Sequence, residues 1–325
     1  MESNIVIDLT NDSDAENPVT STDVSQNSSQ KKQRKIRKSK HKIKMISDFF
    51  RDRASGHHSR PRFQLAALAN IATNGQSVIL GNPDTQHFGT TLIDRGWACG
   101  YRNCQMLISG LISDSGRVNV NSRFPEDRTV PSVRQLQEML ELAWRDGFDT
   151  DGAEQLEHRV VGTKKWIGTT EIYCILAHIG VRSSIVDFHC PTAPDGTHPA
   201  LFSWITEYFT DGQPNTTCSS TLLGRSQSPE SGVTNNVGFV AKQPLYLQHQ
   251  GHSRTVVGVE MSEVGTNLLV FDPDVDPGSG DRLSLFRFML RSTRGVGQYQ
   301  VLFIDGSENS TNEALSRVIA SRRIP

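Results

Sequence analysis

Cys99 stands in the segment DRGWACGYRNCQMLISGLI, residues 94–112, directly before a helix-like run. Cys104, Leu107, Ile108 and Leu111 are spaced as on one helix face, which places Cys99 at a helix N-terminus. The free N–H groups and the dipole there stabilise a thiolate, the nucleophilic form of cysteine. Gly96 and Gly100 allow a sharp turn and leave room for a substrate chain. The segment predicts a nucleophile, with a buried packing cysteine as the alternative.

A cysteine nucleophile needs a base and a group that orients the base. His252 begins one predicted strand and Asp272 ends the next, in QHQGHSRTVVGVEM and LLVFDP. With a turn near residues 263–264, these two ends of an antiparallel hairpin lie side by side. The imidazole would take the thiol proton and return it to a leaving amine, while the carboxylate fixes its tautomer. His249 is the competing candidate for the base.

The reaction also needs donors for the oxyanion that forms at the attacked carbonyl. The backbone N–H of Cys99 could supply one. Three polar side chains are candidates for the other, and the sequence does not choose among Gln86, His87 and Gln248.

The segment DPDVDPGSGD invites comparison with a calcium loop through Asp272, Asp274 and Asp276. However, Pro277 stands where an EF-hand needs glycine, and Leu283 stands where it needs glutamate. The five cysteines include no CxxC pair, so a structural zinc site is not expected either. We therefore expect neither a metal nor a cofactor.

The elements that must position these residues run from helices to strands along the chain. Helices are predicted at MISDFFRDRA, FQLAALANIA, SVRQLQEMLELAWRDG and TEIYCILAHIG, besides the one after Cys99. Strands are predicted at VRSSIVDFH, PLYLQHQ, RTVVGVEM, NLLVFDP and QYQVLFID, with a loop over residues 212–238. This order predicts the α+β class, with helices packed on a mostly antiparallel sheet.

The bulk composition favours an intracellular protein with a hydrophobic core. The chain has 325 residues, 36% of them hydrophobic, and a formal net charge of −1. It has no apolar run near the roughly 18 residues of a membrane span, and no signal peptide is evident. Five cysteines, an odd number, argue against a disulfide framework.

Residues 1–44 differ from the rest and are expected to be disordered, whereas residues 45–325 are expected to form the folded domain. Residues 5–16, IVIDLTNDSDAE, resemble a SUMO-interacting motif, in which Ile5, Val6, Ile7 and Leu9 would add a strand to a SUMO sheet. Residues 31–44 hold nine Lys and Arg and resemble a nuclear localisation signal; a solvated linker or a weak nucleic-acid arm are the alternatives. We expect the protein in the nucleus and cytoplasm.

The segment GWACGYRNCQMLISGLI resembles the active-site segment of the peptidases specific for the ubiquitin-fold modifier and of their deubiquitinase relatives. Further matching blocks are TKKWIGTTEIY, DFHCPTAPDGTHPALFSW, PLYLQHQGHSRTVVGVE and LLVFDPD, so that the resemblance covers about residues 85–305. It implies a papain-like cysteine protease fold.

Two branches of that family differ in the source of the histidine. The modifier peptidases carry an Asp-Pro-His box, and here Asp274 takes the place of its histidine. The zinc-finger-containing ubiquitin peptidases use Gly-His-Ser-Arg-Thr, as residues 251–255 offer. The resemblance therefore implies a triad of Cys99, His252 and Asp272, a ubiquitin substrate, a preference for lysine-63-linked chains and a link to genome maintenance. The branch's zinc fingers have no counterpart here; residues 45–80 could replace them as a ubiquitin contact or could simply cap the domain.

Ubiquitin ends in a narrow Leu-Arg-Gly-Gly tail, so its site needs a tight slot and carboxylates for the arginines. Trp97 and Trp166 could wall the slot, and Gly168 would allow a close backbone approach. The carboxylate candidates are Asp146, Asp149 and Glu171. For each of these residues a surface charge or a core aromatic is an open alternative.

Together the residues predict a thiol isopeptidase that removes ubiquitin, with polyubiquitin as substrate and no membrane association. A protease for the ubiquitin-fold modifier is one alternative. A non-catalytic adaptor that binds ubiquitin, SUMO and DNA is another, but an adaptor has no need of an intact triad.

Overall fold

The computed structural model describes residues 61–71, 73, 75–113, 128–211, 236–278, 283, 286–305 and 317–324. All of them fall within the predicted folded domain. The predicted tail with its SUMO-interacting motif and basic run lies outside the described residues, as do the predicted helix at 45–54 and most of the predicted loop at 212–238.

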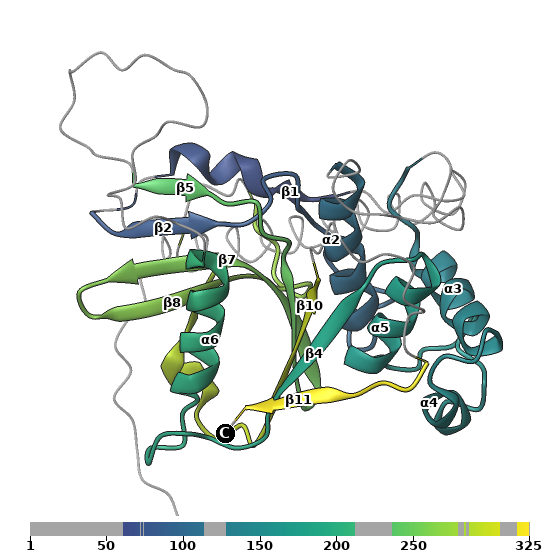
Figure 1. Ribbon diagram of the computed structural model, residues 1–325. Coiled ribbons are helices and arrows are strands. Elements are labelled where there is room, and N and C mark those ends of the chain that lie inside the picture. The colour runs from purple at the N-terminus through teal and green to yellow at the C-terminus, as the bar shows by residue number, and fades with distance from the viewer. Residues whose placement is uncertain are drawn as a thin grey trace, which may run out of the picture. The chain divides into compact units, whose positions relative to one another are not determined.

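A nine-stranded sheet forms the centre of the described part of the chain (Figure 1). Its main path runs β11-β4-β10-β6-β7-β2-β5, and β8 continues from β7 to β9. The strands are β2 (Ser77–Leu80), β4 (Ser183–Phe188), β5 (Val237–Phe239), β6 (Leu245–His249), β7 (His252–Ser262), β8 (Gly265–Phe271), β9 (Arg287–Met289), β10 (Tyr299–Ile304) and β11 (Ser321–Ile324). Only the β2–β5 and β4–β11 pairs within it are parallel, so the predicted mostly antiparallel sheet is confirmed.

Helices cover both faces of this sheet (Figure 1). They are α2 (Cys99–Ser113), α3 (Val133–Arg145), α4 (Thr150–Gln155), α5 (Thr169–His178) and α6 (Pro199–Thr210). Tyr246 packs in the core with α2, α3 and α5, whereas its neighbours Leu245 and Leu247 pack in the core with α6. This alternation along β6 shows that one face meets α2 and α5 and the other meets α6. The predicted α+β class, with helices packed on a mostly antiparallel sheet, is confirmed.

One predicted helix is wrong, and two observed helices, α4 and α6, were not predicted. The segment FQLAALANIA is not an α-helix: β1 (Phe63–Gln64) pairs with β3 (Gln86–His87), and a 3-10 turn, η1 (Leu65–Asn70), follows. Cross-strand pairing to β3 overrides the helical pattern at the start of this segment. Helix α6 was not predicted because the segment before it, CPTAPDGTHP, is rich in residues typical of turns. Pro199 occupies the first position of this helix, where proline is favourable. A second 3-10 turn, η3 (Leu290–Thr293), follows β9.

Local sequence explains the predicted helix α3. Ser132 caps it: the Ser132 hydroxyl accepts from the Gln135 N–H, and the Gln135 side chain accepts in return from the Ser132 N–H at 2.8 Å. Gly147 follows the helix with φ +87°, the left-handed conformation that ends helices. Within the described part of the chain, no helix has the length and apolar character needed to cross a membrane.

The β7–β8 hairpin has the register that the sequence predicted. Ser262 pairs with Gly265 across the turn, and Thr255 pairs with Phe271 at the open end. A bulge between Val256 and Gly258 shifts the register by one residue. The hairpin therefore ends with His252 and Asp272 close together.

Gly258 in β7 pairs with Leu80 in β2, and a Cβ on Gly258 would come 2.3 Å from the Ile79 carbonyl oxygen. We predict that Gly258→Ala lowers the free energy of unfolding by about 1–3 kcal/mol because the two strands must separate. Gly238→Ala in β5 is the matched control, since a Cβ there meets nothing within 4 Å. Thermal unfolding should show a lower Tm for the first variant alone; equal Tm values would contradict the argument.

Candidate active site

Cys99 is the first residue of α2, and its side chain is half-buried. An ion pair between Asp94 and Arg102 ties the preceding turn to the helix. Gly96 in that turn has φ +86°, as the sequence anticipated. The role of Gly100 is different from the predicted one: a Cβ there would lie 2.6 Å from the Ile167 carbonyl oxygen, so this glycine makes room for the chain's own backbone.

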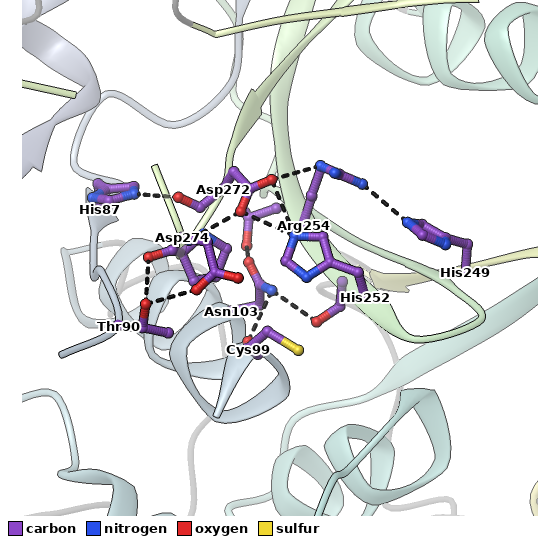
Figure 2. A network of polar contacts seen from close by, with 12 residues as sticks. His87, Thr90, Cys99, Asn103, His249, His252, Arg254, Asp272 and Asp274 are labelled. Carbon is purple, nitrogen blue, oxygen red and sulfur yellow. Dashed lines mark hydrogen bonds and ion pairs between the residues drawn. The ribbon is translucent and has the colours of Figure 1, made fainter. Parts of the chain in front are cut away.

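His252 and Asp272 are paired at the open end of the hairpin. The His252 Nε2 atom lies 3.0 Å from both carboxylate oxygens of Asp272. Because a carboxylate only accepts, Nε2 carries a proton, and Nδ1 is the ring atom left to exchange a proton with the sulfur. Figure 2 shows the imidazole between Asp272 and Cys99. The structure thus brings together the three predicted triad residues.

The electrostatics of the three groups favour a thiolate–imidazolium pair. Burial alone would raise the pKa of Cys99, but hydrogen bonding by His252 and Ser253 brings the pKa below the usual thiol value. Burial alone would lower the pKa of His252, yet Asp272 and Cys99 raise it to about 9. By contrast, burial raises the pKa of Cys104 and Cys174, which are buried in the core.

The carboxylate of Asp272 accepts two further hydrogen bonds. Arg254 Nε donates to Oδ2 at 2.8 Å, and the backbone N–H of Asp274 donates to Oδ1 at 3.0 Å. Burial works to raise the pKa of Asp272, but His252 and Arg254 lower it below the usual carboxyl value. The aspartate therefore stays ionised in a largely buried position.

Sequence reasoning missed Arg254. Alternate residues of a strand share a face, so Arg254 follows His252 toward Asp272. Its guanidinium carbon lies 5.1 Å over the Phe288 ring. The signal that could have identified it is its spacing of two from the histidine in the same strand.

His249, the competing base, has another role. Its Nδ1 lies 3.0 Å from the Gln250 carbonyl, to which it must donate, so its Nε2 accepts from Arg254 Nη1 at 3.2 Å. Burial, followed by the positive charge of Arg254, lowers the pKa of His249. A neutral ring held on an arginine is not placed to accept the thiol proton, as Figure 2 also shows.

The three oxyanion candidates lie in different places. His87 is buried, and its Nε2 donates to the backbone carbonyl of Asp272 at 2.9 Å, so it supports the acid and is not free to face the sulfur (Figure 2). The Gln86 N–H bonds to the Ser109 hydroxyl, ten residues beyond Cys99 along α2, or about 15 Å away. Neither residue is therefore placed to donate to an oxyanion beside the Cys99 sulfur, because β3 contacts α2 away from its N-terminus.

Gln248 is the candidate that lies on the same face of the sheet as Ser253, next to Cys99. It pairs across β6–β7 with Ser253, which contacts Cys99. Its Oε1 accepts from the Tyr246 hydroxyl at 2.6 Å, and its Nε2 donates to the His249 carbonyl at 2.8 Å. The amide nitrogen keeps a second hydrogen for another acceptor.

The residues proposed for the substrate slot flank the triad. Trp97 is half-buried, packs edge-on against Tyr101 and donates to the Ile93 carbonyl at 3.2 Å. Trp166 is 55% exposed, and a Cβ on Gly251 would lie 4.0 Å from its ring. A Cβ on Gly168 would similarly lie 4.0 Å from Gln248 Oε1. Trp166 and Gly168 therefore lie beside the strand ends that carry the histidine and Gln248.

The three carboxylate candidates already have local partners. Glu171 Oε2 accepts from the Gly168 N–H at 2.7 Å, and burial raises the pKa of Glu171. Asp146 pairs with His178 Nδ1 at 3.3 Å. Asp149 caps α4 by accepting from the Gly152 N–H at 3.2 Å. Each of the three thus stabilises a helix end or a histidine, whatever else it binds.

One group among the described residues could hold a metal ion: His252, Asp272 and Asp274, with ligand atoms within 4.8 Å of one another. Two of these are the paired histidine and aspartate. The third, Asp274, accepts a hydrogen bond from the Thr90 hydroxyl at 2.7 Å. The protein's own donors thus account for these atoms.

A cysteine at a helix end, with a histidine–aspartate pair on an adjoining sheet, is an arrangement typical of papain-like cysteine peptidases. Residues 74–287 match Peptidase family C78. The chain belongs to peptidase family C78, which confirms the expected resemblance.

Several relatives are similar over most of this chain. "Zinc finger-containing ubiquitin peptidase 1" of Rattus norvegicus is 38% identical over 273 residues, and the Homo sapiens protein of that name is 36% identical. Each match covers 79% of this chain and 43% of the relative, so the chain spans less than half of their length. "Ubiquitin carboxyl-terminal hydrolase mug105" of Schizosaccharomyces pombe is 33% identical over 64% of this chain and 71% of the relative.

Among solved structures, "Crystal structure of UfSP from C.elegans" is similar to this chain. It is 15% identical, with a TM-score of 0.39, over 68% of this chain and 32% of the other.

The two neighbouring histidines give the first test of the site. We predict that His252→Ala lowers kcat/KM by about 10²- to 10⁴-fold, because the base is lost. His249→Gln should keep activity within about tenfold, because a glutamine oxygen can still accept from Arg254. Steady-state kinetics on an aminocoumarin amide of the substrate's C-terminus would measure both. The opposite order of effects would make His249 the base.

The pH dependence follows from the pKa shifts. Activity should rise as Cys99 ionises, below the usual thiol pKa, and fall as His252 loses its proton near pH 9, because the imidazolium must protonate the leaving amine. Asp272→Asn removes the anion that raises the pKa of His252, so the alkaline limb should move to lower pH and kcat should fall. The pH profile of kcat/KM measures both limbs; an unmoved alkaline limb in the variant would exclude this role for Asp272.

Proposed function

We propose that the chain is a deubiquitinating cysteine peptidase that hydrolyses the isopeptide bond after the C-terminal glycine of ubiquitin. The observation that carries this proposal is the placement of Cys99 beside the paired His252 and Asp272, where the pKa shifts favour a thiolate and an imidazolium. The names of the relatives, which include a ubiquitin peptidase and a ubiquitin hydrolase, support the choice of substrate.

The geometry leads to a two-stage reaction. The Cys99 sulfur attacks the glycine carbonyl carbon, and a carbon–sulfur bond forms as the carbonyl oxygen becomes an oxyanion. The proton on His252 Nδ1 then passes to the lysine amine, the carbon–nitrogen bond breaks, and a thioester remains. Water loses a proton to Nδ1 and attacks the thioester, which releases ubiquitin and restores the thiolate–imidazolium pair.

Asp272 acts through the imidazole during both stages. It holds Nε2, so that Nδ1 always faces the reacting atoms. The backbone N–H of Cys99 and the Nε2 group of Gln248 are the donors we assign to the oxyanion. Gln248 is chosen because it shares the sheet face of Ser253, beside the sulfur.

The slot for the Leu-Arg-Gly-Gly tail would run between Trp97 and Trp166. Gly168 offers backbone without a side chain at this place, which suits the two glycines of the tail. Burial is the main cause that raises the pKa of Glu171, and the negative charge of Asp149 adds to it. An arginine of the tail would relieve that repulsion, and Asp146 could hold the second arginine.

The runner-up substrate is the ubiquitin-fold modifier. The position of the proposed base argues against this substrate, because His252 lies in β7 and not in the loop that follows Asp272. Asp274, at the position of the box histidine, accepts from Thr90. These residues favour the ubiquitin branch.

Further parts of the proposal rest on the sequence and its resemblance alone. They are a preference for lysine-63-linked chains, a role in genome maintenance, and a location in the nucleus and cytoplasm. SUMO binding through Ile5, Val6, Ile7 and Leu9, and weak nucleic-acid contact through residues 31–44, belong with them. Polyubiquitin chains would be the main partner.

Linkage-defined diubiquitins and tetraubiquitins test the substrate. We predict cleavage of lysine-63-linked chains in preference to lysine-48-linked and linear chains, and none by Cys99→Ala, which lacks the nucleophile. Gel electrophoresis over a time course measures this. Equal cleavage of all linkages would leave a deubiquitinase without the proposed preference.

Electrophilic probes separate the alternatives. A ubiquitin probe should label Cys99, and a probe built on the ubiquitin-fold modifier should not; the reverse would favour the runner-up. A chain lacking residues 1–44 should keep its hydrolytic activity. If neither probe labels Cys99, and the chain lacking residues 1–44 loses its main binding interaction, the non-catalytic adaptor hypothesis replaces the enzyme hypothesis.

A further inference from the structure

Asn103 lies one helical turn beyond Cys99 and is fully buried. Its Nδ2 atom donates to the Cys99 carbonyl at 2.9 Å and to the Ser253 hydroxyl at 3.0 Å. Its Oδ1 atom accepts from the Thr255 hydroxyl at 2.8 Å. One side chain thus links the helix of the nucleophile to the strand of the base (Figure 2).

The orientation of this amide is determined by its partners. The Cys99 carbonyl can only accept, so the nitrogen and not the oxygen must face it. The second hydrogen of that nitrogen then goes to Ser253, and the oxygen receives the Thr255 proton. Ser253 and Thr255 are two residues apart in β7, so both face α2.

The amide in turn determines what the Ser253 hydroxyl can do. Its oxygen receives a hydrogen from Asn103, so its own hydrogen must go elsewhere. Ser253 contacts both the Cys99 sulfur and the Tyr246 hydroxyl. Tyr246 has given its hydrogen to Gln248, so its oxygen can accept from Ser253 when the sulfur is protonated. A thiolate is the stronger acceptor, so ionisation of Cys99 draws the Ser253 hydrogen toward the sulfur.

We propose that Asn103 is a positioning residue that fixes Cys99 relative to His252 and directs the Ser253 hydroxyl onto the sulfur. The inference concerns the reactivity of the thiol and rests on the proposed function only for its role in hydrolysis. Ser253 follows His252 directly in the strand, so the helix end and the imidazole cannot separate without breaking a buried hydrogen bond.

Alkylation of Cys99 by iodoacetamide as a function of pH tests the proposal without any ubiquitin substrate. Peptide mapping by mass spectrometry separates Cys99 from the exposed Cys190. Asn103→Ala and Ser253→Ala should each move the midpoint of the alkylation profile to higher pH. A shift of one pH unit lowers the thiolate fraction about tenfold at pH values below the midpoint. Hydrolysis should lose kcat with little change in KM.

Thr255→Val should have a smaller effect on the midpoint. It removes the donor to the Asn103 oxygen but leaves both Nδ2 bonds, so the direction of the Ser253 hydrogen is kept. This variant and Ser253→Ala carry the test if Asn103→Ala does not fold.

Asn82→Ala is the matched structural control. Asn82 is also a buried asparagine whose Nδ2 donates to a backbone carbonyl of α2, at Gly110, 2.9 Å away. It should lower Tm without moving the alkylation midpoint. The proposal is overturned if Asn103→Ala and Ser253→Ala keep the wild-type midpoint, or if Asn82→Ala shifts it as much. Failure to cleave ubiquitin would leave this comparison intact, so the two proposals fail separately.

Discussion

An imidazolium held between a thiolate and a carboxylate is the interaction on which the rest of this structure depends. The three groups are largely buried, and burial alone would neutralise all of them. Their mutual attraction reverses that tendency only while they stay in contact. The surrounding elements can therefore be understood as the means of holding the end of α2, the start of β7 and the end of β8 at one point.

These three ends are held together by separate bonds. The helix end is tied to its own turn by Asp94 and Arg102, and to β7 by Asn103. The β8 end is held by the hairpin register and by His87, which bonds the Asp272 carbonyl. Because these bonds come from segments far apart in sequence, the site forms only when the sheet and α2 have packed together.

The sequence predicted the parts of the site that depend on local pattern. Helical spacing located Cys99 at the head of a helix, and the hairpin turn set Asp272 opposite the start of β7. It could not predict contacts that require knowing how distant segments pack. Gln86 and His87 are polar residues that precede Cys99 in the sequence. In the structure, Gln86 bonds to Ser109 far along α2 from the sulfur, and His87 bonds to the backbone carbonyl of Asp272. Asn103 was missed because its role comes only from that packing, whereas the spacing of Arg254 from His252 in one strand could have identified the arginine.

The position of the base on β7 explains the neighbouring residues. A histidine in the loop after Asp272 would need no support from a strand. A histidine in β7 is followed two residues later by Arg254, which donates to Oδ2 of the same carboxylate. That arginine carries a positive charge close to the imidazolium and works to lower the pKa of His252. The neutral His249 accepts from Arg254 Nη1 while Arg254 Nε donates to Asp272, so the guanidinium is held between the two side chains. A base on β7 is thus accompanied by an arginine on the same carboxylate and by an acceptor for that arginine at position 249, which links the residues from His249 to Arg254 through hydrogen bonds.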